Sequence, residues 1–150
     1  MAEIRSEYQV TKMEVLAKVE YLSDVISFVG KLAERLGLNK KEAKHLELVT
    51  EETCLNVIEH AFDPEENGVY NIIVERQPGK IVLAVEDQGL PFDFTKFKPD
   101  DDKGLGMLLM RTFADEIKFQ NIGRGGKRVE IVKNLSYKEM EVNLVQTRGY

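Results

Sequence analysis

The feature that most constrains the fold is a long stretch with helical periodicity, roughly Lys41 to Ala61. Asn39 is placed to cap the start of this helix, with Glu42 three residues later to complete a capping box. Small and apolar side chains recur at the spacing of one buried helical face, namely Ala43, Leu46, Thr50, Thr53, Val57 and Ala61. A helix with such a face has to bury it against another layer, so the rest of the chain is expected to pack around it.

Two polar residues on the same helix, Glu52 and Asn56, are four positions apart and therefore stack on a second stripe. Small or apolar residues flank this stripe on both sides, Val49 and Thr53 on one and Leu48 and Leu55 on the other. A carboxylate and an amide between such flanks indicate polar groups aimed into a pocket. There the amide can ligate a hard cation, and the carboxylate can take a proton or orient a water. The alternative is a surface helix with a few exposed leucines.

Length and charge place the chain among single-domain globular proteins. Its 150 residues fit one domain with one core, predicted over residues 1–135, with 136–150 as a C-terminal tail or an added strand. Hydrophobic residues make up 43% and charged residues 31%, which is ordinary for a soluble domain. The formal net charge of −5 argues against an extended nucleic-acid surface, which needs a basic excess.

Cysteine usage and hydropathy predict a cytoplasmic protein. Cys54 is the single cysteine, so an internal disulfide is excluded and a reducing compartment suits the chain. It falls on or beside the buried face of the central helix and is expected to be a small core residue rather than a catalytic thiol. No run reaches the length of a membrane span, and the start of the chain, MAEIRSEYQV, contains no apolar secretory core.

The order of the expected elements predicts the architecture. In chain order they are a strand over 12–19, a helix capped by Ser23 and ended by Gly37, the central helix, a hairpin of strands 69–76 and 81–85, a loop over 93–103, a helix from Gly104 to Ile117, and a hairpin of strands 117–120 and 129–132. The third helix is expected to bury Leu105, Leu108, Leu109, Thr112 and Phe113. Paired strands with helices between the pairs predict an α+β two-layer sandwich, with helices on one face of a mixed, mostly antiparallel sheet. A pocket is expected between the layers, under the long loop.

Two further motifs bear on that pocket. In DQGLP, Asp87 ends a strand and Gly89 follows, so the carboxylate can accept a hydrogen bond from a flat ligand that approaches the backbone closely. Taken alone, this motif reads better as a turn aspartate. In KGLGM, Gly104 and Gly106 open a helix whose free N–H groups suit phosphate oxygens, although a flexible lead-in explains them equally. Neither a GxGxxG fingerprint nor a P-loop is present.

The three motifs in order, ExxxN, DxGxP and GxG, resemble the N, G1 and G2 boxes of the GHKL (Bergerat-fold) ATPase superfamily. The stretches EETCLNVIEHAF, DQGLPFD and GLGMLLMRTFADEI are most similar to those of the anti-sigma-factor serine/threonine protein kinases, and the resemblance covers roughly 13–135. It implies ATP and Mg²⁺ as cofactors. Asn56 would ligate the Mg²⁺, and Glu52 would be the general base or would orient the attacking hydroxyl.

The resemblance also implies how the nucleotide is held. Asp87 would bind the adenine amino group, and Gly89 would let the base sit close. The phosphates would be wrapped by Gly104, Leu105 and Gly106. One departure concerns the adenine edge, because these kinases usually carry a Gly-Thr pair late in the sheet and here Gly126 is followed by Lys127.

The function implied by the resemblance is phosphorylation of an anti-anti-sigma (STAS-domain) protein, which regulates transcription by partner switching. A sigma factor would be a second partner. Dimers are common in the family, and no feature of the sequence decides the oligomeric state. An alternative, motivated by Lys127, is a nucleotide-binding regulatory module without kinase turnover. The catalytic domain of a split histidine kinase ranks lower, because the chain contains no dimerisation helix pair with a phosphoacceptor histidine.

Overall fold

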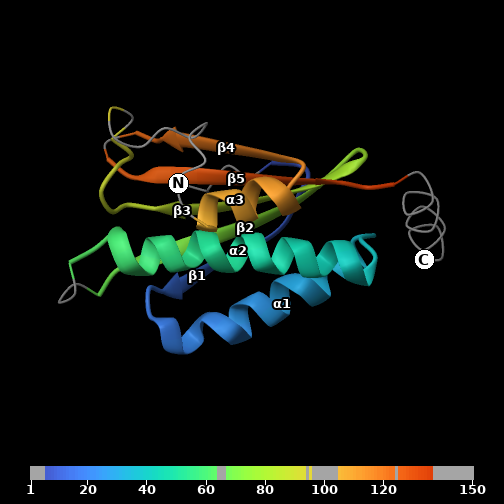
Figure 1. Ribbon diagram of the computed structural model, residues 1–150, viewed down its shortest axis with the longest axis horizontal. Helices are drawn as coiled ribbons and strands as arrows, with labels where there is room; N and C mark the ends of the chain where they lie inside the picture. The colour runs from blue at the N-terminus through green and yellow to red at the C-terminus, as the bar shows by residue number, and fades with distance from the viewer. Residues whose placement is uncertain (1–5, 64–66, 94, 96–104, 124, 137–150) are drawn as a thin grey trace.

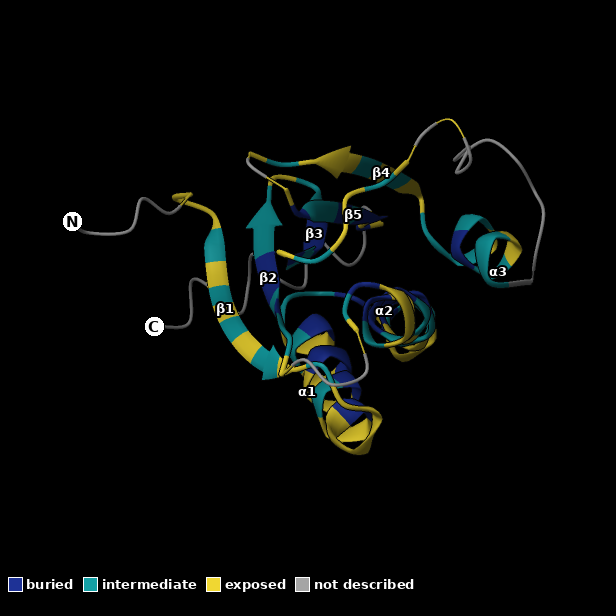
Figure 2. Ribbon diagram, turned by 90° about the vertical axis from the view of Figure 1, so that its left-hand side faces the viewer, coloured by how far each residue is buried: buried dark blue, intermediate teal, exposed yellow. Residues whose placement is uncertain are grey.

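A computed structural model describes residues 6–63, 67–93, 95, 105–123 and 125–136. Its elements are β1 (Gln9–Leu16), the short 3-10 helix η1 (Val19–Tyr21), α1 (Leu22–Arg35), α2 (Lys40–His60), β2 (Val69–Gln77), β3 (Lys80–Asp87), α3 (Leu105–Phe113), β4 (Glu116–Asn121) and β5 (Lys127–Asn134). The strands form one sheet in the order β1-β2-β3-β5-β4 (Figure 1). Figure 2 shows the helices gathered on one side of this sheet. The predicted two-layer α+β fold is therefore confirmed.

The sheet register brings the ends of distant strands together. Every strand pair in the described part of the sheet is antiparallel, so the expected mixture of directions is not observed. Gly79, with a φ of 74°, turns the chain between β2 and β3. Strand β3 then pairs with β5 across a long connection, and this register sets Asp87 directly opposite Lys127. That pairing is the structural basis of the candidate site described below.

Helix α2 lies between α1 and α3 in the helix layer and supplies the centre of the core (Figure 2). All the residues predicted for its apolar face are buried. Thr50 and Thr53 are tolerated there because their hydroxyls donate to the carbonyls of Leu46 and Val49, at 2.7 and 2.8 Å. Burial also raises the pKa of the Cys54 thiol to about 12, so this cysteine is a core residue, as predicted.

Helices α1 and α3 depart from their predicted limits. Ser23 lies inside α1 rather than at its cap, because η1 already turns the chain before the helix begins. Helix α3 ends at Phe113 instead of Ile117, because the N–H of Asp115 donates to Val132 and the chain has already joined the sheet there.

The buried side of α3 was also predicted wrongly in part. Leu108 is 51% exposed and Thr112 is exposed, whereas Met110 is almost completely buried. The side chain of Leu105 and the residues 137–150 of the expected tail lie outside the described part of the chain.

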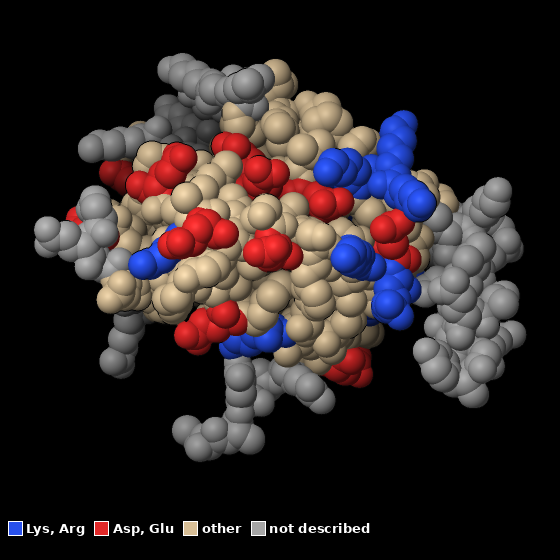
Figure 3. Space-filling view, turned by 90° about the horizontal axis from the view of Figure 1, so that it is seen from below, with Lys and Arg blue, Asp and Glu red and all other residues tan. Residues whose placement is uncertain are grey.

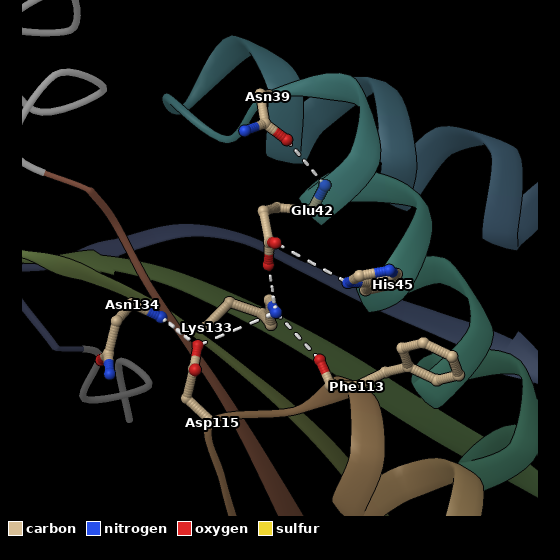
Figure 4. A network of polar contacts seen from close by, with 7 residues as sticks. All are labelled: Asn39, Glu42, His45, Phe113, Asp115, Lys133 and Asn134. Carbon is tan, nitrogen blue, oxygen red and sulfur yellow. Dashed lines mark hydrogen bonds and ion pairs between the residues drawn. The ribbon is translucent and has the colours of Figure 1, made fainter.

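A buried lysine on β5 contacts the start of α2 and the end of α3. Lys133 on β5 is 3% exposed, and its Nζ donates to the carbonyl of Phe113 at 2.9 Å. The same ammonium pairs with Glu42 in the first turn of α2 and lies 3.8 Å from Asp115 (Figure 4). Asn39 caps α2 as predicted, since its side-chain oxygen accepts from the Glu42 N–H at 2.8 Å. The network therefore ties the start of α2 to the end of α3.

This network makes the stability of the fold depend on pH. The hydrogen bond from Lys133 lowers the pKa of the Glu42 carboxyl in the folded protein. The resulting stabilisation is complete above the ordinary glutamate pKa of about 4.3 and is lost as the pH falls through the lowered value. We expect Glu42→Gln to reduce the free energy of unfolding at pH 7 by about 1–2 kcal/mol. Urea unfolding at several pH values would measure it.

The matched control is Glu51→Gln, which removes one negative charge from an exposed position of the same helix. This control should leave the free energy of unfolding nearly unchanged. The difference between Glu42→Gln and the wild type should shrink once the pH falls below about 4.3. A difference that stays constant through the acid range would show that the Glu42 charge does not stabilise the fold.

Charged side chains on the surface follow the composition. On the face seen in Figure 3, acidic side chains extend across the middle, and the largest group of basic ones lies toward one end. The described residues on this face do not form a continuous basic surface of the kind that binds nucleic acid. Within the residues described, no helix combines the length and hydropathy needed to cross a membrane.

Candidate functional site

A cavity of about 340 Å³ opens between α2, α3 and the sheet. Its walls are Thr53, Asn56, Val57 and His60 from α2, Met107 and Met110 from α3, Phe119, Lys127 and Val129 from the strands, and the segment 91–93. Most of this lining is apolar, with a few polar groups of different kinds, which is the usual composition of a small-molecule site. The predicted pocket between the helices and the sheet is therefore present.

At one end of the cavity a buried ion pair joins β3 to β5. Asp87 is 3% exposed, and its Oδ1 accepts from the ammonium of Lys127 and from the N–H of Gly89, both at 2.9 Å. The lysine also donates to the carbonyl of Leu90 at 2.9 Å. The cavity wall at this point is formed by Lys127, and Asp87 is bonded to that lysine without lining the cavity itself.

The second oxygen of Asp87 has no partner within the described structure. Oδ2 is buried and accepts no hydrogen bond there. A buried carboxylate oxygen without a donor is costly, since desolvation is not compensated. A ligand amino group that reached this oxygen would satisfy it, so this acceptor fits the exocyclic amine of adenine.

Gly89 allows the loop after β3 to pack on the end of α2. A Cβ atom at this position would lie 2.2 Å from the carbonyl oxygen of Ala61, and the adjacent Leu90 N–H donates to that same oxygen at 3.1 Å. A side chain would therefore push the loop off the helix. The structure thus gives Gly89 a role in the chain's own packing, and its predicted contact with a base stays a prediction.

The other predicted residues meet where α3 begins. Glu52 and Asn56 lie one turn apart on α2, with Asn56 exposed and lining the cavity. Glu52 is half-buried against the first turn of α3, because a Cβ on Gly106 would lie 2.1 Å from its Oε1. Burial raises the pKa of the Glu52 carboxyl, and the charges of Glu59 and Glu51 raise it further. A carboxylate of raised pKa beside a cavity is a candidate general base.

The structure only partly describes the two residues Gly104 and Leu105 that were predicted to bind phosphate. Gly104 lies outside the described residues, and Leu105 is the first residue of α3. Among the described residues, no cluster of three or more His, Cys, Asp or Glu is arranged to hold a metal ion. A cation bound at Asn56 would therefore depend on ligands from a phosphorylated molecule, which is how Mg²⁺ is commonly held.

Sequence reasoning missed much of the cavity wall. Phe92 and Phe119 meet edge to face, with ring centroids 5.6 Å apart, and the ammonium of Lys127 lies 5.8 Å from the Phe92 centroid. Met107 and Met110 provide the wall on the side of α3. The sequence did single out Lys127, which stands where the family pattern has a threonine. It did not indicate that this lysine pairs with Asp87.

The fold and the site define a class of domain in which a long helix and an antiparallel sheet enclose a ligand cavity behind a short helix. Residues 15–133 match the histidine kinase-like ATPase domain family, and the chain belongs to this family. The resemblance to the GHKL superfamily is thereby confirmed.

Within this family, the chain is similar to a group of serine-protein kinases. The chain is 28% identical over 138 residues to the serine-protein kinase RsbW of Bacillus subtilis (strain 168), an alignment that covers 83% of this chain and 85% of that protein. It is 24% identical over 151 residues to the serine-protein kinase RsbW of Oceanobacillus iheyensis, covering 92% and 94% of the two chains. These relatives confirm the similarity to that group of kinases.

Solved structures agree on the fold. A histidine kinase domain from the blue-light activated histidine kinase of Erythrobacter litoralis EL346 superposes with a TM-score of 0.60 at 21% identity. That match covers 81% of this chain and 62% of the other. The RsbU and RsbW domains of Rv1364c from Mycobacterium tuberculosis match with a TM-score of 0.59 at 15% identity. This match covers 84% of this chain and 33% of the other, so it concerns one part of a longer protein.

Proposed function

We propose that this protein is an ATP-dependent serine/threonine kinase that phosphorylates an anti-anti-sigma (STAS-domain) protein and regulates transcription by partner switching. The observation that carries the proposal is the half-buried Glu52, of raised pKa, against the first turn of α3 and one turn from Asn56. A sigma factor would be the second partner, and the protein would act as a homodimer. The kinase relatives support this assignment.

Each residue of the site would have a separate role in binding one nucleotide or in the transfer reaction. Bound Mg²⁺-ATP would supply the transferable phosphoryl group and neutralise its charge. Asn56 would hold the metal through its amide oxygen, and backbone N–H groups of the segment Gly104, Leu105 and Gly106 would hold the phosphates. Asp87 would accept from the adenine amino group through its free oxygen. Glu52 would take the proton of the attacking hydroxyl.

Transfer of label from γ-labelled ATP to a purified STAS-domain protein of the same organism tests the proposal. The expected result is label on a serine or threonine of that partner. A folded sample that binds nucleotide but transfers no label would favour the second candidate, a regulatory module without turnover. The Lys127–Asp87 ion pair is the observation that favours this candidate, because a lysine occupies the place of the threonine usual in these kinases. Calorimetry with ADP and ATP would measure the binding.

Gly106 offers a way to move the candidate base without touching it. In Gly106→Ala the new methyl group would meet the flexible end of the Glu52 side chain, so the carboxylate must shift while the backbone stays. We expect the transfer rate to fall by about 100-fold, since small displacements of a reacting group have effects of this size. The thermal midpoint should remain close to that of the wild type. Single-turnover transfer and thermal melting measure the two quantities.

Gly30→Ala is a matched control for this substitution. Gly30 is also helical, and its added methyl group would meet the carboxylate of Glu47, but on α1 and outside the cavity. The control should leave the transfer rate unchanged. Equal rates for Gly106→Ala and the wild type would contradict the role assigned to Glu52.

A further inference from the structure

Within the described residues, Lys127 is the charged residue that the strands contribute to the cavity wall. The lysine side chain is only 12% exposed. It is held by two acceptors, Asp87 Oδ1 and the Leu90 carbonyl, each at 2.9 Å. These two acceptors hold the ammonium in one place, so it is not freely solvated.

The bonds at this point leave one donor and one acceptor side by side. An ammonium has three N–H donors, and two of those on Lys127 are used by Asp87 and Leu90. The carboxylate of Asp87 has one oxygen occupied by two donors and the other without any in the described structure. A ligand in the cavity would therefore meet the third N–H of Lys127, and the carboxylate with the free oxygen is bonded to that same lysine.

Adenine carries the complementary pair on its edge. Its exocyclic amino group is a donor, and ring nitrogens on either side of it are acceptors. The amino group suits the free oxygen of Asp87, and a neighbouring ring nitrogen suits the third N–H of Lys127. The nearby Phe92 ring, with its centroid 5.8 Å from the ammonium, adds a flat apolar surface for the base.

We propose that Lys127 is a specificity-determining residue that donates a hydrogen bond directly to a ring nitrogen of the nucleobase, beside the contact made by Asp87. This inference rests on the proposed binding of an adenine nucleotide. It gives the departure at Lys127 a function, because a charged donor replaces the threonine usual at this position. Recognition of the base then depends on a ring acceptor as well as on the amino group.

Binding of nucleotide analogues tests the proposal on the unmodified protein. Calorimetry would compare ADP with 1-deaza-ADP and 7-deaza-ADP, each of which lacks one ring acceptor. We expect one of the two analogues to bind about 10-fold or more weakly than ADP, the size of a lost charge-assisted hydrogen bond. In Lys127→Met that same analogue and ADP should bind to the variant with equal affinity. Lys118→Met, which removes an exposed lysine of β4, should keep the wild-type pattern.

Each outcome separates the two proposals. No binding of ADP to folded wild-type protein would overturn both the proposed function and this inference. Binding of ADP together with equal binding of both analogues would overturn the inference alone. The inference is also overturned if the analogue still binds more weakly than ADP to Lys127→Met. It is overturned as well if Lys127→Met binds ADP more tightly than the wild type does, which would show that the lysine competes with the base. Because Lys127→Met leaves Asp87 without its cation, thermal melting and a parallel Lys127→Thr series guard against misfolding. Equal binding of both analogues to the wild type would overturn the inference without any variant.

Discussion

Glu52→Gln is expected to lower the rate of phosphoryl transfer by about 100- to 10,000-fold, the usual contribution of a general base. Glutamine has nearly the same shape as glutamate, so the contact with the first turn of α3 at Gly106 is kept. The amide cannot take a proton from the attacking hydroxyl. Nucleotide affinity should stay within a few-fold of the wild type, because the proposed contacts to the base and to the metal come from Asp87, Lys127 and Asn56.

Single-turnover transfer and calorimetry with ADP would separate these two effects. Glu59→Gln is the matched control, because it removes a neighbouring charge from an exposed position of the same helix. This control should retain most of the transfer rate at neutral pH. A Glu52→Gln variant with full transfer activity would show that the reaction needs no base at this position and would leave the carboxylate without a chemical role.

The parts of the fold that could be predicted are those governed by local periodicity. The cap at Asn39 and the buried face of α2 follow from side-chain spacing alone, and the structure confirms both. The hairpin of β2 and β3 was equally readable, because the turn composition Gln77-Pro78-Gly79-Lys80 separates two apolar runs, and the structure gives Gly79 a positive φ there. These features depend on residues close in the chain, where spacing and geometry are directly linked.

The parts that failed depend on partners far away in the chain. The phase of α3 was misjudged because it is a short helix of 9 residues, in which Leu108 and Met110 are equally apolar and only packing against α2 and the sheet decides which one is buried. The buried Lys133 was not foreseen either, because its partners Glu42 and Phe113 come from two other elements. Propensity is overridden by tertiary contacts in such cases.

The candidate site shows the same division. Glu52 and Asn56 were recognised from their spacing on one helix, and the structure places Asn56 in the wall of a cavity with Glu52 one turn away. The ion pair between Asp87 and Lys127 could not be predicted, since the two residues are 40 positions apart and meet only through the register of β3 and β5. Lys127 stood out as a departure from a family pattern, but its contact required the sheet.

Asp87→Asn is expected to weaken ADP binding by on the order of 100-fold and to shift the base preference away from adenine. Two donors, the Gly89 N–H and the Lys127 ammonium, both point at Oδ1 and require an acceptor there. The asparagine amide must therefore place its oxygen at that position and its NH₂ group where the free oxygen was. A donor at this position repels the amino group of adenine but accommodates the carbonyl oxygen that hypoxanthine carries instead.

The preference should therefore shift from ADP toward inosine diphosphate. Calorimetry with both nucleotides would measure it, and thermal melting would confirm that the variant folds with Lys127 beside a neutral partner. Asp87→Ala is the control, because it removes the acceptor without introducing a donor and should lose ADP binding without favouring the inosine nucleotide. If Asp87→Asn kept the wild-type preference for ADP, the amino group of the base could not be bound at Asp87. The orphaned oxygen would then have to be satisfied in some other way, because leaving it buried without a donor is costly.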